Sequence, residues 1–345
     1  MKKLGTIFLI TIFGCLSGCR DIYVNPAGYD ENLADFEATW NRINDVYPFL
    51  KFKNIDWDAL YLVYQKRTQE AQGDEFIQVL NDILAELRDG HIYFEMKGGA
   101  QIYPWYPARY FKDKHTYDPF VVRKYFDREL TVTESGSAEY GILPQNIGYI
   151  FLSDFHDDYL VHEFPTIVNS LINTGGIIID IRQRRGGTSQ NVEAVVSHFI
   201  QEPLAWPKFF LLDQSIVIDP IQPKEPFYSN PVIVLVNGST FSAGEICTEV
   251  LKQLPAVTAV GDTTGGGGVA SSGNPPEARG EYILPSGKLI YIGTGYFEKY
   301  DGQPFEWVGI LPDIRIVNTS EEIENGIDKQ LEYAIQFITL ENCNR

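Results

Sequence analysis

The sequence predicts an α/β fold with a mostly parallel sheet, preceded by a helical cap. Apolar residues recur at helical spacing between residues 31 and 94, beginning with Leu33, Phe36 and Trp40. Beyond residue 147, short apolar runs alternate with amphipathic stretches, a pattern typical of parallel strands joined by helices. With 345 residues, of which 44% are hydrophobic, the chain is long and apolar enough to bury a large core.

The N-terminus reads as a leader and not as part of this fold. Two lysines precede an apolar run of about ten residues, which is too short to span a bilayer as a permanent helix. The run ends in Leu-Ser-Gly-Cys at 16–19, which is similar to a bacterial lipoprotein processing site. We therefore expect residues 1–18 to be a signal peptide, Cys19 to be lipidated and residues 19–30 to form a tether. An ordinary secretory signal is the alternative. As a lipoprotein, the protein would be attached to the bacterial cell envelope, on a periplasmic or surface face.

Charge and cysteine content exclude several classes of partner. The net charge of −18 becomes −20 when Lys2 and Lys3 leave with the leader, so electrostatic binding to nucleic acid or to anionic lipid head groups is not expected. No CxxC or His-rich spacing predicts a metal site, and no cofactor is expected. Cys247 is predicted to be a core residue. The sequence does not predict an oligomeric state.

The cap, residues 31–94, is predicted to hold three helices. Pro48 ends the first helix, Asp56 caps the second, and Gly90 is expected at the left-handed position after the third. Residues 95–146 form a mixed, aromatic-rich connecting region, too short for an inserted PDZ-type domain. The aromatic residues between 103 and 126 either line a groove for extended peptides or belong to the core.

The predicted core, residues 147–318, alternates strands with helices. Strands are expected at 148–152, 176–182, 231–236 and 257–261, of which 176–182 and 231–236 should be buried. Helices are expected at 159–172, 192–200 and 242–254. A hairpin at 281–292 adds an antiparallel piece, and residues 319–345 are expected to form a C-terminal helix.

A serine at the start of a predicted helix is the first candidate for chemistry. Ligands of open α/β sheets bind at the carboxyl ends of the strands, and Ser242 follows such an end. The free amides and the dipole of the first helical turn suit a developing oxyanion, although Ser242 could also be a simple N-cap. Thr240 occupies the first glycine position of a Gly-x-Ser-x-Gly elbow, which argues against an α/β-hydrolase. Ser239 and Thr240 are expected to be loop hydroxyls that bind backbone groups.

Other polar loops and histidines give weaker signals. Gly186 and Gly187 let the backbone approach a substrate closely, whereas the glycine run 265–268 lacks the Lys-Ser/Thr of a phosphate loop. His91, in Asp-Gly-His at 89–91, is a candidate base, but a lone histidine is more often structural. The other histidines are His115, His156, His162 and His198.

Six segments, taken together and in this order, resemble the family of carboxy-terminal processing and tricorn serine peptidases. They are LRDGHIYFE (87–95), IGYIFLSDF (147–155), GIIIDIRQRRGG (176–187), PVIVLVNGSTFSAGEI (231–246), AVGDTTGGG (259–267) and WVGILPDI (307–314). The resemblance covers about residues 31–318. It implies a crotonase/ClpP-like superhelical core with a helical cap and no PDZ domain. It also implies a serine peptidase that acts on peptide or protein substrates without a metal or cofactor.

The resemblance assigns roles to particular residues. The family nucleophile falls on Ser242, and the oxyanion hole on the amides of Ala243 and of Gly186 or Gly187. In the processing branch of the family a lysine acts as the base, but the matching position here is Gly267.

The tricorn-like branch instead uses a histidine after the cap and a late glutamate, which match His91 and Glu306. In such a triad a neutral imidazole accepts the serine proton and a carboxylate holds the imidazole. Glu298 and Asp301 are rival orienting acids. The tricorn-type site also has a hydroxyl just before its histidine, where this chain has Gly90, so Ser239 or Thr240 is left to fill that role.

Two other functions stay open. A catalytically degenerate protein on the same fold would hold apolar ligands or glycans. A crotonase-like acyl-CoA enzyme would use backbone amides as its oxyanion hole and would not need Ser242 with His91.

Overall fold

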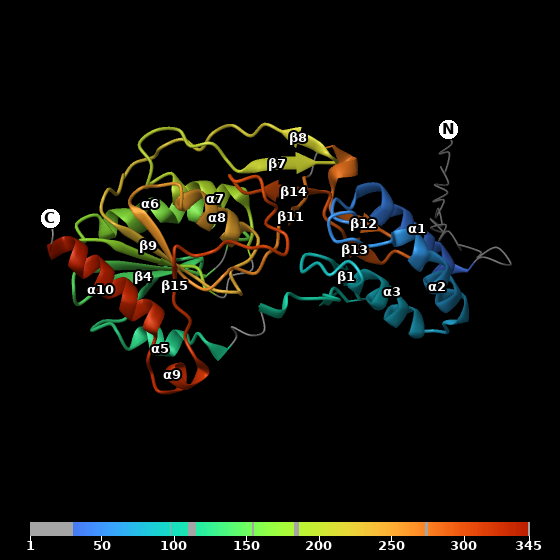
Figure 1. The fold of residues 1–345 in the computed structure, drawn as a ribbon, viewed down its shortest axis with the longest axis horizontal. Helices are drawn as coiled ribbons and strands as arrows, with labels where there is room; N and C mark the ends of the chain where they lie inside the picture. Colours follow the sequence, from blue (N-terminus) through green and yellow to red (C-terminus); the bar gives the residue numbers. More distant parts are fainter. Residues whose placement is uncertain are drawn as a thin grey trace, which may run out of the picture.

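The computed structural model describes residues 30–96, 98–109, 115–153, 155–182, 186–272 and 275–343. The predicted signal peptide, Cys19 and nearly all of the predicted tether lie outside these residues. The described chain forms two lobes, a smaller cap and a larger α/β core (Figure 1). None of the helices in the described ranges combines the length and the apolar character that crossing a bilayer requires.

The cap begins with three helices, which lie where the helical periodicity predicts them. They are α1 (Glu31–Val46), α2 (Trp57–Glu70) and α3 (Glu75–Ala85). Asp30 caps α1, and Asp56 caps α2 by accepting a hydrogen bond of 3.1 Å from the Ala59 amide. The apolar faces of these helices bury a shared cluster that includes Trp40, stacked on Trp57 with ring centroids 4.3 Å apart.

A small antiparallel sheet completes the cap. Its strand order is β12-β13-β1-β2, with β1 at Tyr93–Glu95, β2 at Gln101–Ile102, β12 at Glu281–Ile283 and β13 at Leu289–Tyr291. The hairpin β12–β13 was predicted to belong to the core, but it pairs with β1 and its Ile290 packs into the cap cluster. Cross-strand pairing between distant segments decides this placement, and the local sequence does not encode it.

The core is built on a sheet with strand order β15-β10-β9-β6-β5-β4-β3. Its strands are β3 (Thr131–Val132), β4 (Ala138–Leu143), β5 (Ile147–Leu152), β6 (Ile177–Asp180), β9 (Val232–Val236), β10 (Val257–Gly261) and β15 (Ile314–Arg315). Within this sheet β5, β6, β9, β10 and β15 pair in parallel, and β4 pairs with β5 in the antiparallel direction. The core sheet therefore extends beyond the boundary predicted at residue 146, because β3 and β4, from the predicted connecting region, belong to it.

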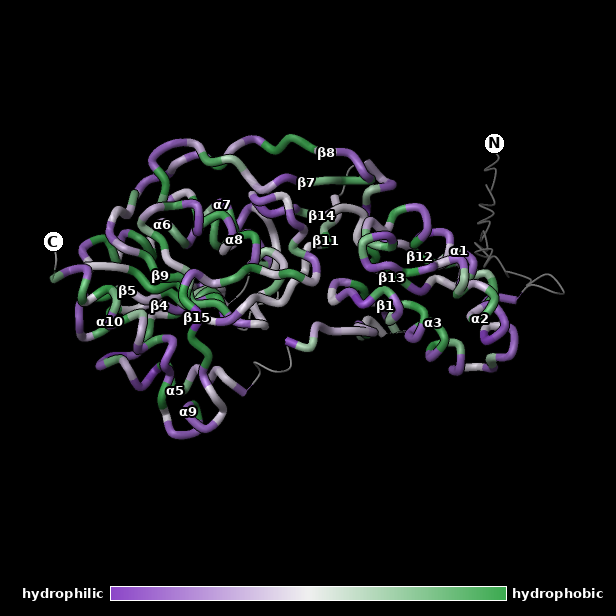
Figure 2. The backbone as a smooth tube through the Cα atoms, viewed as in Figure 1, coloured by the Kyte–Doolittle hydropathy of each residue, from purple (hydrophilic) through white to green (hydrophobic). Residues whose placement is uncertain are grey.

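Helices cover both faces of this sheet, which explains why its central strands are apolar throughout (Figure 2). One face packs on α6 (Tyr159–Leu171), α7 (Ser189–Val196) and α8 (Ala243–Leu251), and the other on α10 (Lys329–Cys343). Successive strand residues point to opposite faces: Val234 lies in the first cluster, and Ile233 and Leu235 lie in the second. The α/β core with an N-terminal helical cap is confirmed.

A third sheet lies between the two lobes, with strand order β11-β14-β7-β8. Its strands are β7 (Lys208–Leu211), β8 (Gln214–Ile216), β11 (Val269–Ala270) and β14 (Gly295–Glu298). The remaining short elements are α5 (Pro119–Arg123), η2 (Pro276–Ala278) and α9 (Ser320–Glu324). The described residues of the connecting region form no separate PDZ-type domain.

Two local predictions are corrected. The single helix expected at 319–345 is broken into α9 and α10, because Gly326 adopts a left-handed φ of +79° between them. After α3, Arg88 and not Gly90 takes the left-handed conformation, with φ at 46°. A Cβ on Gly90 would lie 3.0 Å from Phe241 Cζ. Gly90 therefore serves a close approach to the loop before Ser242, which leaves little space there for the hydroxyl residue of the tricorn-type site.

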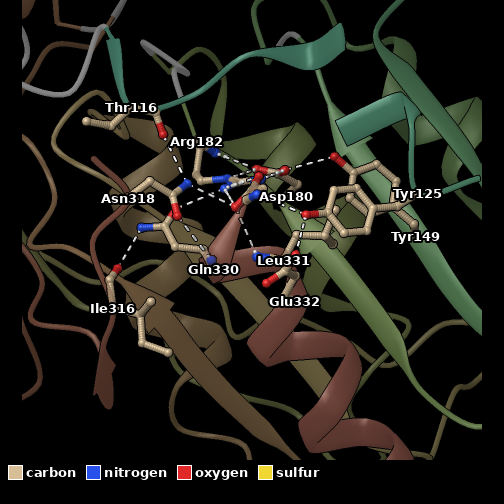
Figure 3. Close-up of polar contacts among 11 residues, drawn as sticks. Thr116, Tyr125, Tyr149, Asp180, Arg182, Ile316, Asn318, Gln330, Leu331 and Glu332 are labelled. Atoms are coloured by element: carbon tan, nitrogen blue, oxygen red, sulfur yellow. Dashed lines mark hydrogen bonds and ion pairs between the residues drawn. The ribbon is translucent and has the colours of Figure 1, made fainter. Parts of the chain in front are cut away.

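A buried charge network fixes the end of β6, which leads toward Gly186 (Figure 3). The side chain of Arg182 is fully buried and donates to Asp180 Oδ2 at 2.6 Å and to Asp328 Oδ1 at 2.9 Å. Asp328 directly precedes α10, and Tyr149 on β5 donates to Asp180 Oδ2 at 2.8 Å. Because two carboxylates surround one guanidinium, the network ties β5, β6 and the start of α10 together.

Candidate active site

Ser242 stands in a sharp turn between β9 and α8. Its φ of 54° and ψ of −120° are rare for a residue with a side chain, and such strain is typical of residues held for function. The Ser242 amide donates to Glu245 Oε2 at 3.1 Å, and Thr240 Oγ1 donates to the Ile181 carbonyl oxygen at 3.0 Å. Thr240 therefore ties this turn to the end of β6, as a loop hydroxyl bound to the backbone.

Glu245 organises the loop beside the serine. Its carboxylate is fully buried and accepts hydrogen bonds from Thr264 Oγ1 at 2.5 Å, from the Gly266 amide at 2.8 Å and from the Gly267 amide at 2.7 Å. Burial raises the pKa of Glu245, and these hydrogen bonds oppose the shift. A single acid thus holds both the turn that carries Ser242 and the glycine run that the sequence alone did not explain.

Two glycines lie against the serine from the end of β6. A Cβ placed on Gly186 would lie 3.0 Å from Ser242 Oγ and 2.9 Å from the Ala243 amide nitrogen. Gly186 and Gly187 both have φ in the left-handed half of conformational space, at 114° and 152°. The structure therefore brings the predicted oxyanion-hole residues Ala243, Gly186 and Gly187 to the serine, where first-turn amides have no partner inside the helix.

His91 reaches this site from the cap. Its ring stacks on Phe241 with centroids 4.6 Å apart, and its Nδ1 lies 3.5 Å from Asp89 Oδ1. Neither ring nitrogen makes a hydrogen bond to the described residues. His91 and Ser242 line the same two adjoining cavities, of about 740 and 390 Å³. The cap and the core thus jointly form one site.

Two buried carboxylates surround the imidazole. Ligand atoms of Asp89, His91 and Glu306 all lie within 4.8 Å of one another, and both acids are 1% exposed. Burial by itself raises the pKa of Asp89, but the charge of Lys53, the nearby imidazole of His91 and the hydrogen bond from the His91 amide outweigh it and hold this pKa below its ordinary range. Burial, and then the charge of Asp89, raises the pKa of Glu306 to about 7, although Lys53 opposes that shift.

Lys53 from the cap neutralises part of this negative charge. Its side chain is fully buried, and its Nζ lies 2.5 Å from Glu306 Oε1 and 3.7 Å from Asp89 Oδ2. Nζ also donates to Tyr47 Oη at 2.7 Å and to the Leu87 carbonyl oxygen at 2.9 Å. A divalent cation bound by the two acids and His91 would face this ammonium, so the cluster suits an acid–base relay better than a metal site.

The rival side chains lie elsewhere. Glu298 is on β14, where its residue pairs with Lys208, and the exposed Asp301 forms an ion pair of 3.6 Å with Lys299. His198 is buried, with Nδ1 2.9 Å from the Pro226 carbonyl oxygen. Of the other histidines, His156 lines the smaller of the two cavities that His91 and Ser242 share.

Sequence reasoning missed Asp89 and Lys53. The Asp-Gly-His motif did not by itself assign a role to Asp89, although its position two residues before His91 lets its carboxylate accept the His91 amide hydrogen bond, at 2.8 Å. That spacing is a local signal that could have identified it. Lys53 gives no such signal, because it lies in an ordinary loop after α1 and meets Glu306 only through the tertiary fold.

Comparisons with known proteins support the resemblance of the motifs. A family model described as peptidase family S41 matches residues 146–316, and the tricorn protease C1 domain matches residues 29–85. The first match spans most of the core, and the second spans the three cap helices.

Among curated proteins, a carboxyl-terminal-processing protease of Synechocystis sp. is 26% identical over 56% of this chain and 44% of that protein. A chloroplastic carboxyl-terminal-processing peptidase 1 of Arabidopsis thaliana is 25% identical over 53% of this chain and 36% of its own length. The chain therefore spans less than half the length of these two relatives.

Among solved structures, a putative peptidase from Parabacteroides merdae is 25% identical with a TM-score of 0.75, covering 90% of this chain and 97% of that chain. The tricorn protease is 16% identical with a TM-score of 0.54, and the match covers 90% of this chain and 37% of that chain. The latter likeness concerns the fold alone.

Proposed function

Because the chain belongs to peptidase family S41, we propose that it is a serine endopeptidase that cleaves peptide or protein substrates through an acyl-enzyme on Ser242. His91 acts as the general base. The observation that carries this proposal is that His91 of the cap and Ser242 of the core line the same two cavities. The matching lysine position of the processing branch is Gly267, so the imidazole is the base that this chain offers.

The reaction follows the triad logic. Ser242 Oγ attacks the scissile carbonyl carbon while its proton passes to His91 Nε2. The carbonyl oxygen becomes an oxyanion, stabilised by the amides of Ala243 and of Gly186 or Gly187. When the tetrahedral intermediate collapses, the imidazolium returns the proton to the leaving amine. Water, deprotonated by His91, then releases the acyl group and restores the Ser242 hydroxyl.

The acids beside His91 hold the imidazole and stabilise its charged form. Asp89 lies nearest, with Oδ1 3.5 Å from Nδ1, which leaves Nε2 for the serine. Glu306 lies within 4.8 Å of the same group, and Lys53 faces both acids. With both acids ionised, two negative charges and one ammonium leave a single net negative charge, which matches the single positive charge that forms on His91. In this assignment Asp89 and Glu306 share the orienting role.

We further propose that the protein is a lipoprotein of the cell envelope, anchored through acyl chains on Cys19. The support is the leader sequence, with its lysines, its short apolar run and the small residues before Cys19. In cells fed an alkyne-labelled fatty acid, the wild-type protein should become labelled and sediment with membranes. The Cys19→Ala variant should show neither property. Equal labelling of both proteins would refute the anchor.

An activity probe tests the catalytic proposal. Diisopropyl fluorophosphate should modify Ser242, located by mass spectrometry, in the wild type. Ser242→Ala and His91→Ala should each lower hydrolysis of unstructured peptides by at least about 10³-fold while remaining folded. His162→Ala is the matched control, because His162 is exposed on α6 and should keep full activity. Absence of labelling together with retained binding of apolar ligands would instead favour a degenerate binding protein.

A further inference from the structure

The smaller of the two cavities beside Ser242 has an aromatic wall. It holds about 390 Å³, and its lining includes five aromatic side chains, namely Tyr93, Tyr103, Tyr106, Phe241 and Tyr291. The same cavity is lined by His91, Gly187 and Ser242, so the wall adjoins the reacting atoms. No Asp, Glu, Lys or Arg of the described residues lines it, and its ionisable side chains other than tyrosine are the imidazoles of His91 and His156.

The four tyrosines form a continuous series of ring contacts. Tyr291 stacks on Tyr93 with centroids 5.1 Å apart and planes at 4°, and Tyr93 contacts Tyr103 at 5.4 Å. Tyr103 in turn contacts Tyr106 at 5.5 Å. All these centroid distances fall in the range of about 4.5–7 Å that favours aromatic pairs. The series joins β1, β13 and the segment after β2, so it exists only in the folded cap.

Hydrogen bonds hold the series in place. Tyr291 Oη lies 2.8 Å from Ser271 Oγ, and Tyr103 Oη donates to Gln101 Oε1 at 3.0 Å. All four rings are only half-buried. The hydroxyl groups of Tyr103 and Tyr291 thus bind residues that do not line this cavity. The rings of these two tyrosines are therefore left as surface that a ligand can contact. A fixed aromatic wall offers apolar contact and ring stacking with little loss of conformational entropy on binding.

The larger cavity has a different character. Its lining includes the acids Glu193 and Asp219 beside five aromatic side chains, and it shares His91, Ser242 and Tyr291 with the smaller cavity. The aromatic residues are Trp206, Phe209, Tyr291, Phe297 and Phe305. Among the described residues, Ser242 therefore lies between a smaller aromatic space lined by no acid and a larger space that combines aromatic rings with two acids. A peptide that crosses this junction would place one flanking side chain against the tyrosines and the other in the space that contains Glu193 and Asp219.

We propose that the tyrosine-lined cavity is the subsite for an aromatic or large apolar side chain of the substrate, directly next to the scissile bond. This inference rests on the proposed serine peptidase activity. It predicts a substrate class, namely unstructured peptides with Phe, Tyr, Trp or Leu at one of the two positions that flank the cleaved bond.

Cleavage of a denatured protein mixture, mapped by mass spectrometry, tests the preference. We expect aromatic and large apolar residues to be enriched more strongly at one flanking position than at the other. Peptides that differ only at that position, with Phe, Ala, Asp or Lys, then give kcat/KM. The Phe peptide should exceed the Ala peptide by about tenfold or more, since lost apolar contact in a pocket is worth that much. Equal rates, or a preference for a charged residue, would overturn the inference.

Variants then connect the preference to the tyrosines. Tyr103→Ala and Tyr106→Ala should each reduce the Phe-to-Ala selectivity, which is the ratio of the two kcat/KM values, by at least about threefold. Tyr159→Ala is the matched control, because Tyr159 is 49% exposed at the start of α6. Selectivity that is unchanged in both cavity variants would overturn the inference.

Labelling of Ser242 by diisopropyl fluorophosphate separates the subsite from the peptidase activity. The reagent is small and does not need the aromatic wall. Normal labelling without any aromatic preference would refute the subsite and leave the peptidase intact. Loss of labelling in the wild type, together with no cleavage of any peptide, would refute the peptidase itself.

Discussion

Replacing Lys53 with methionine is expected to destabilise the protein by an amount that grows with pH. Methionine keeps much of the length of the side chain and removes the ammonium. In the native protein this ammonium lies 2.5 Å from Glu306 Oε1, and both side chains are at most 1% exposed. Removing one partner of a buried ion pair leaves the other charge uncompensated.

The sign follows from the direction in which the pKa of Glu306 moves on folding. Burial, then the charge of Asp89, raises this pKa from an ordinary value of 4.5 to about 7 in the folded protein. Between these values the folded state binds more protons than the unfolded state, so stability falls as pH rises through this window. The fall amounts to about 3 kcal/mol, at about 1.4 kcal/mol for each pH unit between the two pKa values. Above about pH 7 the contribution of Glu306 in the wild type levels off.

Without Lys53, the folded-state pKa of Glu306 should lie higher still. The fall in stability would then continue above pH 7, at up to about 1.4 kcal/mol for each pH unit. At pH 9 the variant should therefore trail the wild type by up to about 3 kcal/mol more than it does at pH 7. The lost hydrogen bonds to Leu87, Arg88 and Tyr47 add a cost that does not depend on pH.

Urea unfolding between pH 6 and pH 9, followed by tryptophan fluorescence, measures this difference. In the double variant Lys53→Met/Glu306→Gln the gap to the wild type should no longer widen above pH 7, because no carboxylate is left to titrate at position 306. Lys66→Met is the matched control, since Lys66 is 74% exposed in an i,i+4 pair with Glu70 and should change stability by less than about 1 kcal/mol. Parallel curves for Lys53→Met and the wild type would refute the reasoning.

Three further predictions concern the elements that hold the site. Gly186→Ala should lower kcat by about 10²-fold, because its methyl group would lie 2.6 Å from Ser242 Cβ. Gly136→Ala is the control, because Gly136 also has a positive φ but no atom lies within 4 Å of the added Cβ, and it should leave kcat unchanged. Glu245→Gln should cost about 1–3 kcal/mol in urea unfolding and lower kcat, since an amide NH₂ would face amide donors of the glycine loop; full activity would contradict this. Arg182→Met should cost about 3–5 kcal/mol by leaving two buried acids unpaired, against less than about 1 kcal/mol for Arg123→Met in the exposed pair with Glu139.

Most helices and strands could be predicted because their buried residues recur at the spacing of a helix or form an unbroken apolar run. The sequence shows which side chains should be buried: those on one face of α1 and all those in the apolar run of β9. The structure buries both sets. The Asp56 cap was predicted for the same reason, since its partner amide lies three residues away. Gly90 was misread because its real constraint, the ring of Phe241, lies far along the chain.

The sequence by itself determined the α/β class, the helical cap, and the candidates Ser242, His91 and Glu306, the last only through resemblance to known motifs. Only the tertiary structure decided that Asp89 lies nearest the imidazole and that Lys53 faces both acids. It also decided that the hairpin β12–β13 joins the cap and brings Tyr291 onto Tyr93. The physical reason is range: periodicity and capping act over a few residues, whereas charges and ring contacts at this site join segments that only the packing of two lobes brings together.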